Sequence, residues 1–224
     1  AGFKKRSIVA STLMKMKQVL GHPAHFLADG SSILDGGEHR SGKMERIDDL
    51  LSAIVANNEK ALIFTQFTNF APAMLAHWER TFGIDVPFLH GGVSKPERDA
   101  MVRDFQNSPG RPGAMLLSLR AGGTGITLTA ANHVIHLDRW WNPAVENQAT
   151  DRAFRIGQKR SVEVHKLVSI GTIEEAIDSV LTEKNELAQS TIRSGESWLA
   201  ELDDDALASM FALRGQEGGG SDGR

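Results

Sequence analysis

The sequence predicts an α/β protein in which helices cover both faces of a doubly wound parallel sheet. From Lys43 onward, segments with helical spacing of apolar residues alternate with short apolar runs typical of strands. Repeated strand and helix units favour a parallel sheet, and right-handed crossovers place helices on both of its faces. The composition, 41% hydrophobic and 24% charged residues over 224 positions, is that of a globular domain.

The predicted elements follow one another in a regular order. We expect strands at 60–66, 86–89, 114–118, 133–137 and 162–169, and helices at 43–56, 69–82, 95–107, 143–154 and 172–191. A leading helix is predicted over 7–20, and Gly21 and Pro23 are expected to end it. Residues 28–42 are rich in Gly, Ser and Asp, which indicates a linker or loop.

These elements divide the chain into four parts. We expect a leading helix and linker over 1–42, the main domain over 43–192, a C-terminal helical extension over 193–213 and a disordered Gly-rich tail over 214–224. The predicted fold therefore has extra helices at both its N- and C-terminal ends.

Composition narrows the function classes. No apolar run approaches the roughly 18 residues that a membrane-spanning helix needs, so we expect no membrane contact and a cytoplasmic protein, nucleoid-associated if bacterial. We also expect a monomer. The absence of cysteine excludes disulfides, thiolate zinc sites and cysteine nucleophiles. His133 and His136, like His22 and His25, are three residues apart without a nearby set of ligands, so we expect no metal site. A net charge of -3 does not by itself indicate a nucleic-acid binder, although binding depends on where charge lies.

One segment is close to a phosphate-binding loop. Residues Gly37 to Met44 read GEHRSGKM, but Met44 stands where the motif needs a hydroxyl to bind Mg²⁺. We favour Ser41 as a helix cap. A nucleotide contact by Lys43 is the less favoured alternative.

A second segment is rich in glycine. Gly122, Gly123 and Gly125 follow a predicted strand and allow the backbone to approach an anion closely. Their spacing is not that of a dinucleotide fingerprint. A tight turn is the alternative interpretation.

A third segment carries paired arginines. Arg152 and Arg155 are three residues apart and would share one face of the predicted helix. Two guanidinium groups suit a triphosphate, because each offers a planar fork of donors and stays charged. A solvated surface is the alternative when the pair is considered alone.

Together these segments resemble a known family. KALIFTQFTN (60–69), FLHGGVSKPER (88–98), the glycine segment, LDRWWNP (137–143) and DRAFRIGQ (151–158) occur in this order. Residues 8–187 are similar to the C-terminal RecA-like lobe of the Swi/Snf family of helicase-like, DNA-dependent ATPases, of the bacterial type. The resemblance implies a RecA-like fold and one half of an ATP-driven DNA translocase.

The resemblance implies roles at the nucleotide. Arg155 would be the arginine finger that reaches the γ-phosphate of ATP, and Arg152 its phosphate or cleft-bridging neighbour. The remaining cleft residues would be Gln148, Asp151, Gly123, Thr124 and Gly125.

The resemblance also implies contacts to the DNA backbone. These would come from Thr65, Gln66, His90, Gly91, Ser118 and Arg120, and they would position DNA without reading its sequence. Trp140 and Trp141 would pack at a helix entry or, alternatively, form a platform for another lobe.

The chain contains neither a complete phosphate loop nor an acidic Mg²⁺ motif. The resemblance therefore implies that ATP with Mg²⁺ is bound mainly by an N-terminal RecA-like lobe of the same polypeptide, upstream of Ala1, and that double-stranded DNA is the partner. We expect the isolated chain not to hydrolyse ATP. The alternatives are a non-catalytic nucleic-acid or protein-binding module with this fold, and a complete small kinase or ATPase that uses Lys43.

Overall fold

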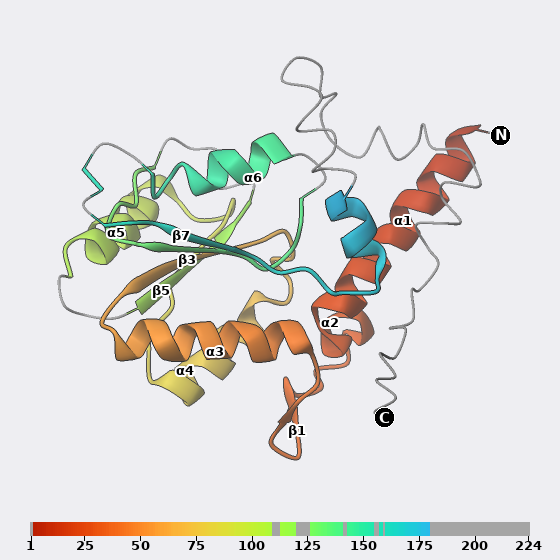
Figure 1. Cartoon of the computed structure of the whole chain (residues 1–224), viewed down its shortest axis with the longest axis horizontal. Helices are drawn as coiled ribbons and strands as arrows, with labels where there is room; N and C mark the ends of the chain where they lie inside the picture. Colours follow the sequence, from red (N-terminus) through yellow and green to blue (C-terminus); the bar gives the residue numbers. More distant parts are fainter. Residues whose placement is uncertain are drawn as a thin grey trace, which may run out of the picture.

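The centre of the protein is a five-stranded parallel sheet (Figure 1). The structure is a computed structural model that describes residues 2–108, 113–119, 126–140, 143–154, 157–158 and 160–179. The strand order is β4-β5-β3-β6-β7. The strands are β3 (Lys60–Thr65), β4 (Phe88–Leu89), β5 (Gly113–Ser118), β6 (His133–His136) and β7 (Glu163–Lys166). The predicted fold class is confirmed.

Helices cover both faces of this sheet. Helices α3 (Gly42–Ala56) and α4 (Ala71–Phe82) lie on one face, and α5 (Lys95–Gln106) and α6 (Pro143–Thr150) lie on the other (Figure 1). Alternate residues of β3 explain the two cores: Ile63 packs in the cluster with α3 and α4, whereas Phe64 packs in the cluster with α5 and α6. Because both faces are covered, every residue of β3 is buried.

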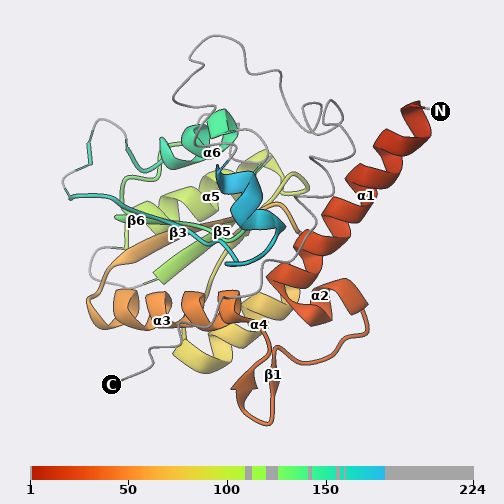
Figure 2. The same ribbon diagram turned by 45° about the vertical axis from the view of Figure 1, so that its right-hand side comes forward.

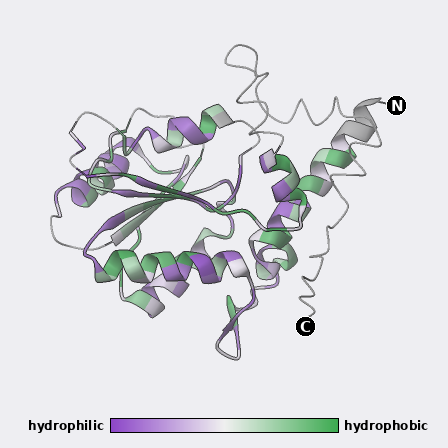
Figure 3. Cartoon of the chain, viewed as in Figure 1, coloured by the Kyte–Doolittle hydropathy of each residue, from purple (hydrophilic) through white to green (hydrophobic). Residues whose placement is uncertain are grey.

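Local signals set the ends of the helices. Ser41 caps α3, where its side chain accepts a hydrogen bond from the Met44 amide, and Ser94 and Glu97 form a capping box at α5. Along α3, Met44, Ile47, Leu51 and Ile54 are buried at helical spacing. Figure 3 shows hydrophobic and hydrophilic residues mixed along this helix, which is the pattern of a helix with one buried face.

Three helical segments lie beyond the sheet at its C-terminal edge. Helix α1 (Gly2–Gly21) packs through Leu13 against Ile173 and Ile177 of a helical segment described over 173–179 (Figure 2). The short helix α2 (Pro23–Leu27) follows α1 directly. The predicted end of the leading helix at Gly21 is confirmed, but Pro23 also begins a second helix that the sequence did not predict. Proline suits the first turn of a new helix, which His22 caps by accepting from the Ala24 amide.

The prediction of an unstructured linker over 28–42 is also incomplete. Strands β1 (Leu34–Asp35) and β2 (Glu38–His39) form an antiparallel hairpin that projects from the domain (Figure 1). Gly36 and Gly37 have φ values of 58° and 95°, as the central residues of a tight hairpin turn require.

The predicted parts over 193–213 and 214–224 lie outside the described residues. Among the described helices, none is long and apolar enough to cross a membrane.

Candidate functional site

Three strands end side by side and bring together residues predicted to contact DNA. Thr65 at the end of β3 pairs with Ser118 at the end of β5, and Leu89 of β4 pairs with Leu117. His90, Ser118 and Thr65 therefore follow one another along the C-terminal edge of the sheet. Loops at this edge are where α/β sheets bind ligands.

Thr65 and Gln66 are held inside the protein. Thr65 is 1% exposed; its hydroxyl donates to Asp138 Oδ2 at 2.6 Å and accepts from the Phe67 amide at 3.0 Å. The Gln66 amide N–H donates to the same Asp138 oxygen at 3.3 Å. These bonds occupy the Thr65 hydroxyl, so the structure does not place it where a phosphate would reach it. Ser118 is also buried, at 4% exposed.

The loop after β4 is more accessible. Gly91 and Gly92 are exposed and His90 is half-buried, with its Nδ1 accepting from the Gly92 amide at 3.1 Å. The His90 ring lies against Phe88, with centroids 4.7 Å apart. A side chain added at Gly91 would meet open space. Of the predicted DNA contacts in the described part of the chain, His90 and Gly91 lie most openly on this edge.

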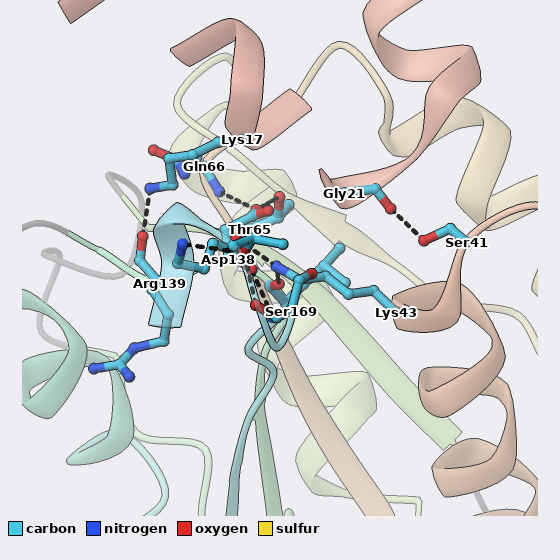
Figure 4. A network of polar contacts seen from close by, with 12 residues as sticks. Lys17, Gly21, Ser41, Lys43, Thr65, Gln66, Asp138, Arg139 and Ser169 are labelled. Atoms are coloured by element: carbon cyan, nitrogen blue, oxygen red, sulfur yellow. Dashed lines mark hydrogen bonds and ion pairs between the residues drawn. The ribbon is translucent and has the colours of Figure 1, made fainter. Parts of the chain in front are cut away.

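A buried polar network stands behind the same edge (Figure 4). Lys43 Nζ donates to Glu174 Oε1 at 2.6 Å and to the Leu137 carbonyl at 3.0 Å, and Lys17 Nζ donates to the Arg139 carbonyl at 2.5 Å. Burial lowers the pKa of Lys17 to about 8, against the opposing charge of Asp138. The network ties α1, α3 and the 173–179 helix to the ends of β3 and β6.

These contacts also resolve the phosphate-loop alternative. The amine of Lys43 is buried and bound to Glu174, and the Ser41 hydroxyl donates to the Gly21 carbonyl at 2.7 Å. Neither group is offered to a nucleotide. The segment therefore caps and anchors α3, and its residues do not fit an ATP site.

Arg139 extends the network toward α6. Its Nε donates to Glu146 Oε1 at 2.9 Å, and a guanidinium nitrogen contacts Asp178. Burial acts to raise the pKa of Glu146, but the Arg139 charge and hydrogen bonds outweigh it and the net pKa is lowered. Glu146 is thus a buried carboxylate that holds the start of α6 against the end of β6.

The predicted helix over 143–154 is too long. Helix α6 ends at Thr150, after which Arg152 and Ala153 form backbone bonds three residues back and the Leu128 amide donates to the Arg152 carbonyl. Arg152 therefore lies in a turn rather than on a helix face, and its side chain is buried, at 3% exposed. Gln148 and Asp151, in contrast, are exposed.

Several predicted residues lie outside the described part of the chain. These are Arg120, Gly123, Thr124, Gly125, Arg155 and Trp141. Trp140 is described, and it packs partly buried against the core on the α5 and α6 face, in agreement with the packing interpretation.

Sequence reasoning missed the residues of the buried network. Asp138, Lys17 and Glu174 were assigned no role. One signal was available: Lys17 comes four residues after Leu13 on the apolar stripe of α1, and a charge at a core position predicts a buried partner.

Comparison with known proteins agrees with this geometry. The family model of the helicase conserved C-terminal domain matches residues 42–157. YwqA of Bacillus subtilis, named as an ATP-dependent helicase/translocase, is 49% identical over 95% of this chain, which spans 22% of that relative.

Solved structures of SWI2/SNF2 ATPases from Sulfolobus solfataricus are also similar. The C-terminal domain has a TM-score of 0.77 and 41% identity over 95% of this chain and 85% of that one. The core in complex with dsDNA has a TM-score of 0.80 and 43% identity over 95% of this chain and 43% of that one. The chain therefore belongs to the helicase conserved C-terminal domain family, and within it to the C-terminal RecA-like lobes of SWI2/SNF2-type ATPases.

Proposed function

We propose that this chain is the second motor lobe of a DNA-dependent ATPase and translocase that works in the cytoplasm. The observation that carries the proposal is the similarity, over 95% of the chain, to an ATPase core that was solved with dsDNA. The accessible loop with His90 and Gly91 at the C-terminal edge of the sheet supports it. The N-terminal RecA-like lobe of the same polypeptide would supply most of the ATP and Mg²⁺ site.

Arg155 and Arg152 are the proposed contribution to the reaction. Phosphoryl transfer spreads negative charge over the transferred group, and a guanidinium held in place stabilises that charge. An arginine finger is worth about 10³ to 10⁵ in rate, or roughly 4 to 7 kcal/mol. Gly123, Thr124 and Gly125 would lie beside the nucleotide in this arrangement.

Because Arg152 is buried in this structure, the protein must rearrange before its guanidinium can contact a nucleotide. With only 3% of the residue exposed, its guanidinium reaches a phosphate only if the turn at 151–153 moves or the N-terminal lobe closes over it. The exposed Gln148 and Asp151 on the same segment would meet the cleft first. We propose that lobe closure brings the arginines to the nucleotide.

The DNA contacts would be made mainly by backbone and small polar groups. His90 and Gly91 are the accessible candidates, and Arg120 would add to them. Each phosphate contact contributes a slope of about -0.9 to the dependence of log affinity on log salt. A lobe with few contacts therefore predicts a modest slope and no sequence preference.

Hydrolysis by the full-length protein and by this chain tests the proposal. We expect the full-length protein to hydrolyse ATP faster when duplex DNA is added, and the 224-residue chain alone to hydrolyse none, because its own residues do not form an ATP site. DNA-independent hydrolysis by the full-length protein, or turnover by the chain alone, would contradict the proposal.

A further inference from the structure

Two neighbouring strands bring two histidines and a glutamate together on one face of the sheet. His133 begins β6 and pairs with Glu163 of β7, while Ile135 pairs with His165. Residues two apart on a strand share a face, so the side chains of Glu163 and His165 lie on the side that His133 also faces. Strand β7 is the edge of the sheet.

The free nitrogens of both histidines face one oxygen. His133 Nδ1 lies 3.7 Å and His165 Nε2 lies 3.8 Å from the same Oε2 of Glu163, and the three ligand atoms are all within 4.8 Å of one another. These separations are too long for hydrogen bonds. Among the described residues, neither buried nitrogen has a hydrogen-bond partner. Buried polar atoms without partners are rare and costly.

A second carboxylate orients His133. Its Nε2 lies 2.7 Å from Glu59 Oε2, and Asn132 Nδ2 donates to the other Glu59 oxygen at 2.7 Å. The Glu59 carboxylate thus holds the Nε2 side of the ring and turns Nδ1 toward Glu163. A carboxylate that holds the far nitrogen of a histidine is a common outer partner of a metal ligand.

The chemistry of the three groups matches zinc. Zinc sites with three protein ligands and a water use imidazole nitrogens and a carboxylate oxygen at about 2.0 to 2.2 Å. Ligand atoms of a tetrahedral site at that distance are roughly 3.4 Å apart, so the three atoms need to move only slightly closer together. The Glu163 side chain is 66% exposed and is free to make this movement.

We propose that His133, Glu163 and His165 bind one zinc ion, with water as the fourth ligand. The ion would join the edge strand β7 to β6 and occupy both partnerless nitrogens. The sequence predicted no metal site because spacing along one strand does not reveal the strand beside it. This proposal is independent of the motor function.

Zinc titration of the untagged, chelator-treated 224-residue chain tests the proposal. By calorimetry we expect one zinc per chain, and Co²⁺ should give the visible absorption of a tetrahedral site. His165→Gln and Glu163→Gln should weaken binding by at least about tenfold, and Glu59→Gln, which touches no metal, by about 10- to 100-fold. Because the Glu163 side chain is largely exposed, its variant tests the site without threatening the fold.

His90→Gln is the matched control, since His90 lies on another strand end, and it should bind zinc as the wild type does. Thermal melting of each metal-free variant verifies that it is folded. Absence of saturable zinc binding in the wild type would overturn the proposal. So would equal affinity in the wild type and in Glu163→Gln and His165→Gln, because the ion would then be held by other histidines.

Discussion

Lys17 is a buried charged residue beside the candidate site, and its titration can be measured. The residue is 1% exposed, and burial lowers its pKa from an ordinary value of 10.5 to about 8. Its ammonium group lies behind the edge of the sheet, hydrogen-bonded to the Arg139 carbonyl and near Asp138. The cost of desolvating this charge is a measurable property of the folded protein.

Raising the pH from 8 to 10.5 should stabilise the protein. Below about pH 8 both folded and unfolded chains hold the proton; between 8 and 10.5 only the unfolded chain does, so the free energy of unfolding rises by about 3 kcal/mol. The chain has no cysteine or tyrosine to titrate in this window. Urea unfolding at several pH values measures the rise.

Two variants isolate the residue responsible. Lys17→Met should remove most of the rise, whereas Lys15→Met, at an exposed position of the same helix, should keep it. An equal pH dependence in both variants would show that other groups cause it.

At the scale of elements, sequence patterns predicted the strands and helices of the sheet well. The buried run of β3 and the Ser94 cap of α5 are local signals, and local signals can be read directly from a sequence. The β1 and β2 hairpin was missed although Gly36 and Gly37 mark its turn. The end of α6 was missed because a distant Leu128 amide captures the Arg152 carbonyl.

The candidate site, too, could be predicted only as far as local sequence signals reach. The meeting of the strand-end loops at one edge could be predicted, because parallel strands end at the same edge. The bond between Lys43 and Glu174 joins residues 131 apart in sequence, and no local pattern indicates such a pair. The buried network was therefore found only in the structure.

Breaking that pair should destabilise the protein strongly. Removing one partner of a buried ion pair leaves a charge uncompensated and costs about 3 to 5 kcal/mol. We expect each single variant, Lys43→Met and Glu174→Gln, to show this loss in urea unfolding. The double variant should lose much less than the sum of the two single losses. Lys95→Met, at an exposed position, should change stability by less than about 0.5 kcal/mol.

Comparing the double variant with the two single variants separates two descriptions of the buried network. Strong coupling would show that α3 and the 173–179 helix are held together through Lys43 and Glu174. Additive losses would mean that the two residues contribute separately, and the description of a single network would be wrong.

At the scale of the whole molecule, the sheet is a scaffold that keeps one edge rigid. Buried polar contacts hold α1, α3, α6 and the 173–179 helix against the strand ends. The exposed Gly91 and the half-buried His90 lie on the same edge, in the loop after β4. A rigid lobe that moves as a unit is what alternating grip on DNA requires.

The rate of DNA-stimulated ATP hydrolysis by the full-length protein with Arg155→Ala tests the central claim most directly. We expect kcat to fall by about 10³ to 10⁵ with an unchanged melting temperature. Arg80→Ala, on α4 and exposed, should keep the wild-type rate. A rate for Arg155→Ala within a few-fold of the wild type would contradict the account.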